Sequence, residues 1–105
     1  MAEIKNVDYQ TLARAVALWT GYDSASCPTR EDEALRSVFP VDEAGRLATI
    51  IKGLEDDFYK SQAHLTAKNL SEMKDIASSD FKRLHPELPK EIANAFAWCY
   101  TFDYK

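Results

Sequence analysis

The feature that most limits the fold is a run of apolar residues spaced three, four or seven positions apart in the middle of the chain. On an α-helix such spacings place side chains on one face, whereas a half-buried β-strand needs an apolar residue at every second position. The pattern therefore predicts a helix that begins near Asp42 and buries one side. Its apolar stripe consists of Leu47, Ile50, Ile51, Leu54, Phe58 and Leu65.

Further helices are predicted on both sides of this stripe, because polar capping residues, prolines and a glycine recur at intervals of helical length. Only three glycines and four prolines occur among 105 residues, which is few for the turns of a β-sandwich. We therefore predict an all-α fold, a compact bundle of four to five helices that forms a single domain over residues 1–105. The expected boundary residues are Asn6 or Asp8, Gly21, Thr29, Pro40, Ser71 and Pro89.

The last ten residues, FAWCYTFDYK, hold five aromatic side chains at alternate positions, which is also the period of a β-strand. No other segment alternates well enough to pair with such a strand, so a helix is favoured. On that helix Ile92, Phe96 and Cys99 should face the core, and the apolar arc is wider than one neighbouring helix covers. At least one of the outer aromatic residues should therefore lie on the far edge, under the first helix or at a contact between molecules. These residues are Trp98, Tyr100, Phe102 and Tyr104.

Charge is distributed unevenly along the chain. The formal net charge is −4, yet residues 23–57 carry nine acidic and four basic side chains, a balance of −5. Such a segment repels nucleic acid and attracts a basic protein, although it also suits a solvated surface that keeps the protein soluble. We predict that its acidic side chains form a binding face. The members of this face are Glu31, Asp32, Glu33, Glu55, Asp56 and Asp57.

Support for an enzyme is weaker. The chain has no glycine-rich phosphate-binding motif and no Glu-x-x-His pair, so neither a cofactor nor a metal is expected. His64 and His85 are expected on the surface and in a loop. A small enzyme would have to use Cys27, which lies in a predicted loop, or the acids at 55–57. Three consecutive helical side chains point about 100° apart, which argues against a shared cation.

The amino terminus lacks the apolar segment of a signal peptide, and no apolar run is long enough to span a membrane, which favours a cytoplasmic protein. Two reduced cysteines would fit that compartment, although the sequence leaves a Cys27–Cys99 bridge open. We predict a non-catalytic protein that binds another protein, in the manner of an inhibitor, immunity protein or regulator. A small enzyme and a homodimer joined through the last helix are the alternatives.

Overall fold

The computed structural model describes residues 8–22 and 24–105, and within them every regular element is a helix. The all-α prediction is therefore confirmed. The short helix α4 replaces part of the long central helix that the sequence predicts, and Asn6 lies outside the described residues. The elements are α1 (Tyr9–Thr20), α2 (Asp32–Arg36), α3 (Val41–Phe58), α4 (Ala63–Thr66), α5 (Leu70–Leu84) and α6 (Lys90–Tyr104).

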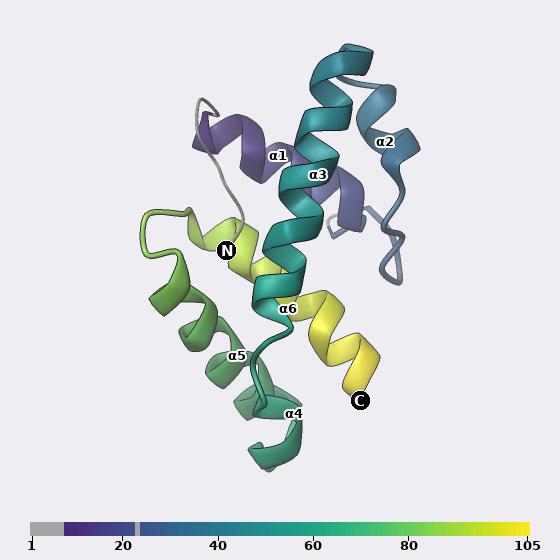
Figure 1. Ribbon diagram of the computed structural model, residues 1–105. Coiled ribbons are helices and arrows are strands. Elements are labelled where there is room, and N and C mark those ends of the chain that lie inside the picture. The colour runs from purple at the N-terminus through teal and green to yellow at the C-terminus, as the bar shows by residue number, and fades with distance from the viewer. Residues whose placement is uncertain (1–7, 23) are drawn as a thin grey trace.

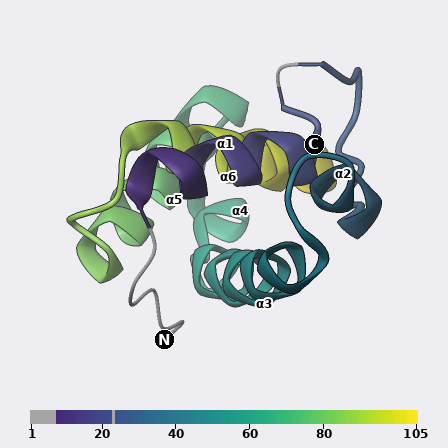
Figure 2. The ribbon, with the colours of Figure 1, turned by 90° about the horizontal axis from the view of Figure 1, so that it is seen from above.

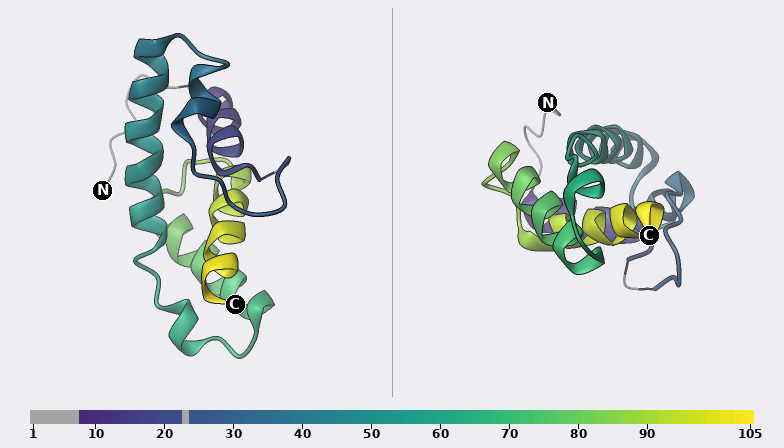
Figure 3. Two further views of the ribbon diagram at one scale, coloured as in Figure 1. Left: turned by 90° about the vertical axis from the view of Figure 1, so that its right-hand side faces the viewer. Right: turned by 90° about the horizontal axis from the view of Figure 1, so that it is seen from below.

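Helix α3, with 18 residues, is the longest of the described helices, and α1, α5 and α6 lie together along one side of it (Figures 1 and 2). Helices α5 and α6 pack against each other as an antiparallel hairpin, while α2 packs on α1 and α3. The last turns of α6 therefore lie near α4 and the start of α5, as Figure 3 shows. None of the described helices is both long and apolar enough to cross a membrane.

Local capping explains several helix ends. The Asp8 carboxylate accepts a hydrogen bond of 2.9 Å from a backbone N–H in the first turn of α1. Gly21 ends that helix with φ at 77°, a left-handed conformation that glycine adopts without strain. Asn69, rather than the predicted Ser71, caps α5 by accepting a 2.8 Å bond from a backbone N–H. The sequence thus predicts the existence of these helices better than their first residues.

The stripe of α3 forms the centre of the core, as predicted. Its members within α3 are at most 8% exposed. The exception is Leu65, which is 71% exposed, because α3 ends at Phe58 and Leu65 belongs to α4. The buried members are Leu47, Ile50, Ile51, Leu54 and Phe58.

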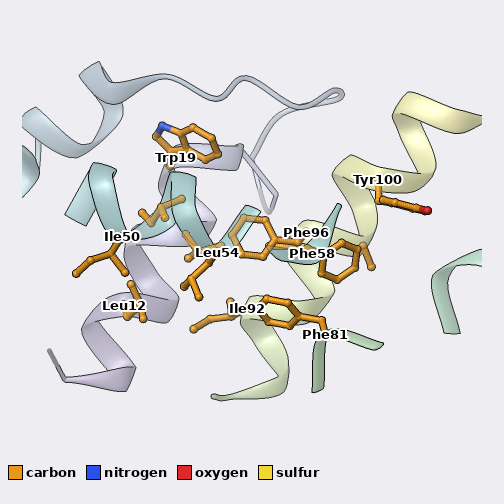
Figure 4. Close-up of a cluster of buried hydrophobic side chains, with 14 of the residues drawn as sticks. Leu12, Trp19, Ile50, Leu54, Phe58, Phe81, Ile92, Phe96 and Tyr100 are labelled. Atoms are coloured by element: carbon orange, nitrogen blue, oxygen red, sulfur yellow. The ribbon is translucent and has the colours of Figure 1, made fainter. Parts of the chain in front are cut away.

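Helix α6 packs against this stripe with its own apolar face, which confirms the helical interpretation of the aromatic terminus. Ile92, Phe96 and Cys99 are fully buried, as expected. The ring centroids of Phe58 and Phe96 lie 6.0 Å apart, and those of Phe58 and Phe81 lie 5.3 Å apart. Figure 4 shows these rings as one cluster contributed by α3, α5 and α6.

Candidate functional site

The three consecutive acids near the end of α3 have three different surroundings. Glu55 accepts a 2.7 Å bond from Nε of Arg30, whereas Asp57 lies 2.9 Å from Nε2 of His85 in the interior. Asp56 is exposed to solvent. This divergence follows from the 100° rotation per residue of an α-helix. The acids at 55–57 therefore do not form one continuous face. The predicted place of Asp57 on the acidic face is wrong because its side chain is buried, whereas that of Asp56 stays a prediction.

The acids at the start of α2 divide in the same way. Asp32 accepts a 2.9 Å bond from the Trp19 indole and a 3.0 Å bond from Lys52, and these bonds lower its pKa. Glu33 pairs with an arginine one turn later but stays largely exposed. Glu31 is exposed and, among the residues that the structure describes, has no ion pair. The start of α2 thus presents Glu31 and Glu33 to solvent.

Arg30 connects the loop before α2 to α3 and α6, an arrangement that we call the Arg30 junction. Its guanidinium donates to Glu55, to the Tyr59 hydroxyl at 2.8 Å and to the Asp103 carboxylate at 2.7 Å. The Tyr59 hydroxyl in turn donates a 2.5 Å bond to Asp103. Burial raises the pKa of Tyr59, and the bond to Asp103 raises it further. Four side chains from three segments therefore hold one another.

The backbone of Arg30 is also unusual, because its φ of 52° lies in the left-handed region. A non-glycine residue occupies that region at a cost of about 1 kcal/mol or more, which the surrounding contacts must offset. The side-chain bonds of the junction supply such contacts. Thr29 fixes the same loop from the other side by donating a 3.0 Å bond to the Trp19 carbonyl. The loop is thereby held between α1, α3 and α6.

The junction brings together two regions that the sequence singles out separately. Asp103 belongs to the last turn of α6, and Glu31 follows Arg30 directly in the chain. Because Arg30 bonds to Asp103, the residue directly before Glu31 is held at the last turn of α6. No local sequence signal indicates this contact, since the two residues are 73 positions apart.

The aromatic residues of α6 fall into two groups. Phe102 and Tyr104 are 38% and 40% exposed, which confirms the prediction that at least one of them lies on the far edge of the helix. Trp98 is half-buried, and its ring lies 5.7 Å from that of Tyr22. A depression of about 190 Å³ beside these rings is lined in part by Leu70, Trp98 and Phe102. We call Tyr22, Leu70, Trp98 and Phe102 the aromatic surface.

Tyr100 does not belong to that surface, and its predicted place there is wrong. Its side chain is fully buried, with the hydroxyl directed away from the core rings (Figure 4). The hydroxyl donates to the Ser61 carbonyl at 2.8 Å and accepts from the His64 backbone N–H at 3.1 Å. Tyr104 stacks on the His64 ring at 4.0 Å between centroids. These contacts hold α4 against α6, a role that alternating aromatics do not indicate.

His85 and Asp57 form a buried pair, with each side chain only 4% exposed. His85 lies in the loop directly after α5, as expected, but its side chain reaches into the interior instead of solvent. The second carboxylate oxygen of Asp57 lies 3.0 Å from Nζ of Lys60. Since 28 residues separate Asp57 from His85, sequence spacing gave no signal for the pair.

The two cysteines are free thiols in contrasting places. Cys27 is exposed, whereas Cys99 is buried in α6, and burial raises the pKa of Cys99 to about 12. A catalytic Cys27 would need a histidine or a helix amino terminus to activate it, and of the two histidines His64 contacts Tyr100 and His85 contacts Asp57. Neither histidine is therefore placed to activate Cys27 within the described residues. In the part of the chain that the structure describes, no three His, Cys, Asp or Glu side chains gather as metal ligands would.

No protein-family model matches this chain, and no curated protein or solved structure matches it. Its function is therefore inferred from the geometry of the site.

Proposed function

We propose that this protein acts by binding a basic protein through the aromatic surface together with the exposed acids Glu31 and Glu33 at the start of α2. The observation that supports the proposal is the bond between Arg30 and Asp103, which ties the loop directly before α2 to the last turn of α6. Glu31 and Glu33 supply the negative charge at this surface. Of the binding residues predicted from the sequence, the proposed surface keeps Glu31, Glu33, Trp98 and Phe102. It leaves out Asp32, Glu55, Asp56, Asp57, Tyr100 and Tyr104.

The chemistry of the surface suits protein recognition. Tryptophan and phenylalanine contribute large apolar area at a small cost in side-chain entropy, and a few such residues dominate the binding energy of many interfaces. Exposed carboxylates at the edge accelerate encounter with a basic partner and add less to the final affinity. Trp98 and Phe102 would therefore anchor the complex, and Glu31 and Glu33 would steer its formation.

The size and acidity of the chain fit an inhibitor, immunity protein or regulator that covers a basic site on another protein. Such a protein would work in the cytoplasm, and the free thiols of Cys27 and Cys99 support a reducing compartment. A homodimer would use the same aromatic surface on two copies, so the two outcomes are separated by the identity of the bound protein.

Affinity capture from the source cell, followed by mass spectrometry, tests this function. The bait with Trp98→Ser and Phe102→Ser should lose a basic protein that the unaltered bait retains. Val41→Ser is the matched control. Val41 is 70% exposed, but it is the first residue of α3, at the end of that helix away from the last turns of α6 (Figure 1). Equal capture of every protein by both baits would contradict the proposal, as would a self-associated chain with no other protein.

The captured partner then allows a test of the electrostatic component. Glu31→Gln with Glu33→Gln should lower the association rate by roughly tenfold at low salt and change the dissociation rate little. Added salt should remove the difference, because exposed charges are screened beyond about 10 Å at 0.1 M. A change confined to the dissociation rate would show that the acids do not steer binding.

A further inference from the structure

The depression beside the aromatic surface already holds a positive charge. It has a volume of about 190 Å³ and is lined by Leu70, Trp98, Thr101, Phe102 and Lys105. The Lys105 ammonium lies 4.3 Å from the centroid of the Phe102 ring, well within the distance of about 6 Å at which a cation and an aromatic face attract each other. In the other two such contacts among the described residues the separation is 6.0 Å. One wall of the depression is therefore a face that binds a cation.

Two aromatic rings contribute to this wall. Trp98 and Phe102 are four residues apart on α6, so they lie next to each other on one side of the helix. The indole ring attracts a cation more strongly than a phenyl ring does. A volume of about 190 Å³ is below the usual range for a small-molecule site, about 300–1,000 Å³, but it admits a single side chain. The depression thus suits one residue of a protein partner.

Lys105 is an exposed side chain that its polar neighbours do not anchor. Asp103, the acidic side chain nearest to it in the chain, is bonded to Arg30 and to Tyr59 instead. The Thr101 hydroxyl donates to backbone carbonyls of α6. The contact with the Phe102 ring is therefore what places the ammonium here, and a cation that stacks better on the two rings would replace it.

A guanidinium is such a cation. It is planar and more weakly hydrated than an ammonium, and it stacks on aromatic faces. We propose that an arginine side chain of the basic partner enters the depression, stacks on Trp98 and Phe102, and displaces Lys105. This inference rests on the proposed function for its partner, and it makes Lys105 an intramolecular competitor for the site.

The peptides hexa-arginine, hexa-lysine and hexa-citrulline are suitable probes, with two-dimensional NMR of the whole chain as the measurement. Hexa-arginine should shift the Trp98 indole N–H and the amides of residues 98–105 with saturation. Hexa-lysine should bind about threefold more weakly, because an ammonium stacks less well, and hexa-citrulline should not saturate because it is neutral. Equal binding of hexa-arginine and either comparison peptide would overturn the inference, as would an unshifted Trp98 indole.

Variants then separate displacement of Lys105 from general charge. Lys105→Gln should strengthen hexa-arginine binding about threefold more than Lys90→Gln does, because it removes the competitor. Lys90→Gln is the matched control, since Lys90 is an exposed lysine at the first position of α6 and its loss changes the net charge equally. Equal effects of the two lysine variants would overturn the inference.

Phe102→Leu completes the comparison, because it removes the ring that Lys105 and the arginine share but keeps an apolar side chain. In this background the advantage of Lys105→Gln over Lys90→Gln should largely disappear, and an undiminished advantage would overturn the inference. A captured basic protein that binds both lysine variants equally would also overturn it while leaving the proposed function intact. Failure of the affinity capture would count against the proposed function instead, because the peptide measurements need no captured partner.

Discussion

Two polar clusters meet the last turns of α3, and they differ in where they lie. The Arg30 junction lies at the surface of the molecule, which we call the rim, and the side chains of Arg30 and Asp103 are 30% and 35% exposed there. The pair of Asp57 and His85 is inside, with 4% exposure on each side chain. Water can replace a lost partner at the rim but not in the interior. The buried pair therefore stabilises the whole fold, whereas the junction fixes one end of α6.

The largest effect is expected from Asp57→Ala. Removing one partner of a buried pair leaves the other without compensation, so the free energy of unfolding should fall by about 3–5 kcal/mol. Denaturant unfolding measures the change, and Asp56→Ala is the control. Asp56 is the exposed neighbour of Asp57, so its substitution should change the free energy of unfolding by less than about 0.5 kcal/mol. Similar losses for both variants would remove the distinction between the interior and the rim.

Leu54→Ala gives an apolar reference for the same helix. Leu54 is fully buried in the stripe of α3, so its truncation should cost about 2–5 kcal/mol. Thr49→Ala, at an exposed position of α3, is a control for helix propensity. A measured loss below about 0.5 kcal/mol for Leu54→Ala would mean that the stripe is not the core.

The pH dependence of stability should report on Cys99. Its folded pKa of about 12 exceeds the value of about 8.5 expected in the unfolded chain. The contribution is therefore complete below about pH 8.5 and is lost as the pH rises, by up to about 1.4 kcal/mol per pH unit. Cys99→Ala should unfold with a shallower decline between pH 9 and 10.5, and Cys27→Ser should follow the unaltered protein. Parallel curves for all three proteins would contradict the assignment.

A smaller and more local effect is expected from Arg30→Asn. Asparagine tolerates the left-handed backbone at this position, so the substitution removes the guanidinium bonds without adding strain. The free energy of unfolding should fall by about 1 kcal/mol, since the side chain is partly exposed. Chemical denaturation checks this value, and a loss as large as that of Asp57→Ala would place the junction among the global determinants of the fold.

The sequence predicted what depends on local spacing. The stripe from Leu47 to Phe58 predicts a buried helix. Three residues of α6, Ile92, Phe96 and Cys99, face the core as their helical positions require. Leu65 was misplaced, because the turn after α3 interrupts a pattern that continues in the sequence.

The site itself was mostly beyond sequence reasoning. Arg30 meets Asp103, and Asp57 meets His85, across 73 and 28 residues, and neither pair has a spacing rule. Tyr100 shows the same limit, since an aromatic residue on the outer arc of a helix can be surface or core. Helix packing decides between them, and here α4 covers its hydroxyl.

Native-state hydrogen exchange of the last turn of α6 tests most directly the claim that the Arg30 junction holds this end of the helix locally. In Arg30→Asn, the amides of residues 101–104 should exchange roughly tenfold faster, while buried amides of α5 such as those of Ala77 and Phe81 keep their rates. Unchanged exchange at 101–104 would contradict the claim, because the aromatic surface would then be held without the junction. An equal acceleration in α5 would contradict it as well, because the junction would then act on the whole fold.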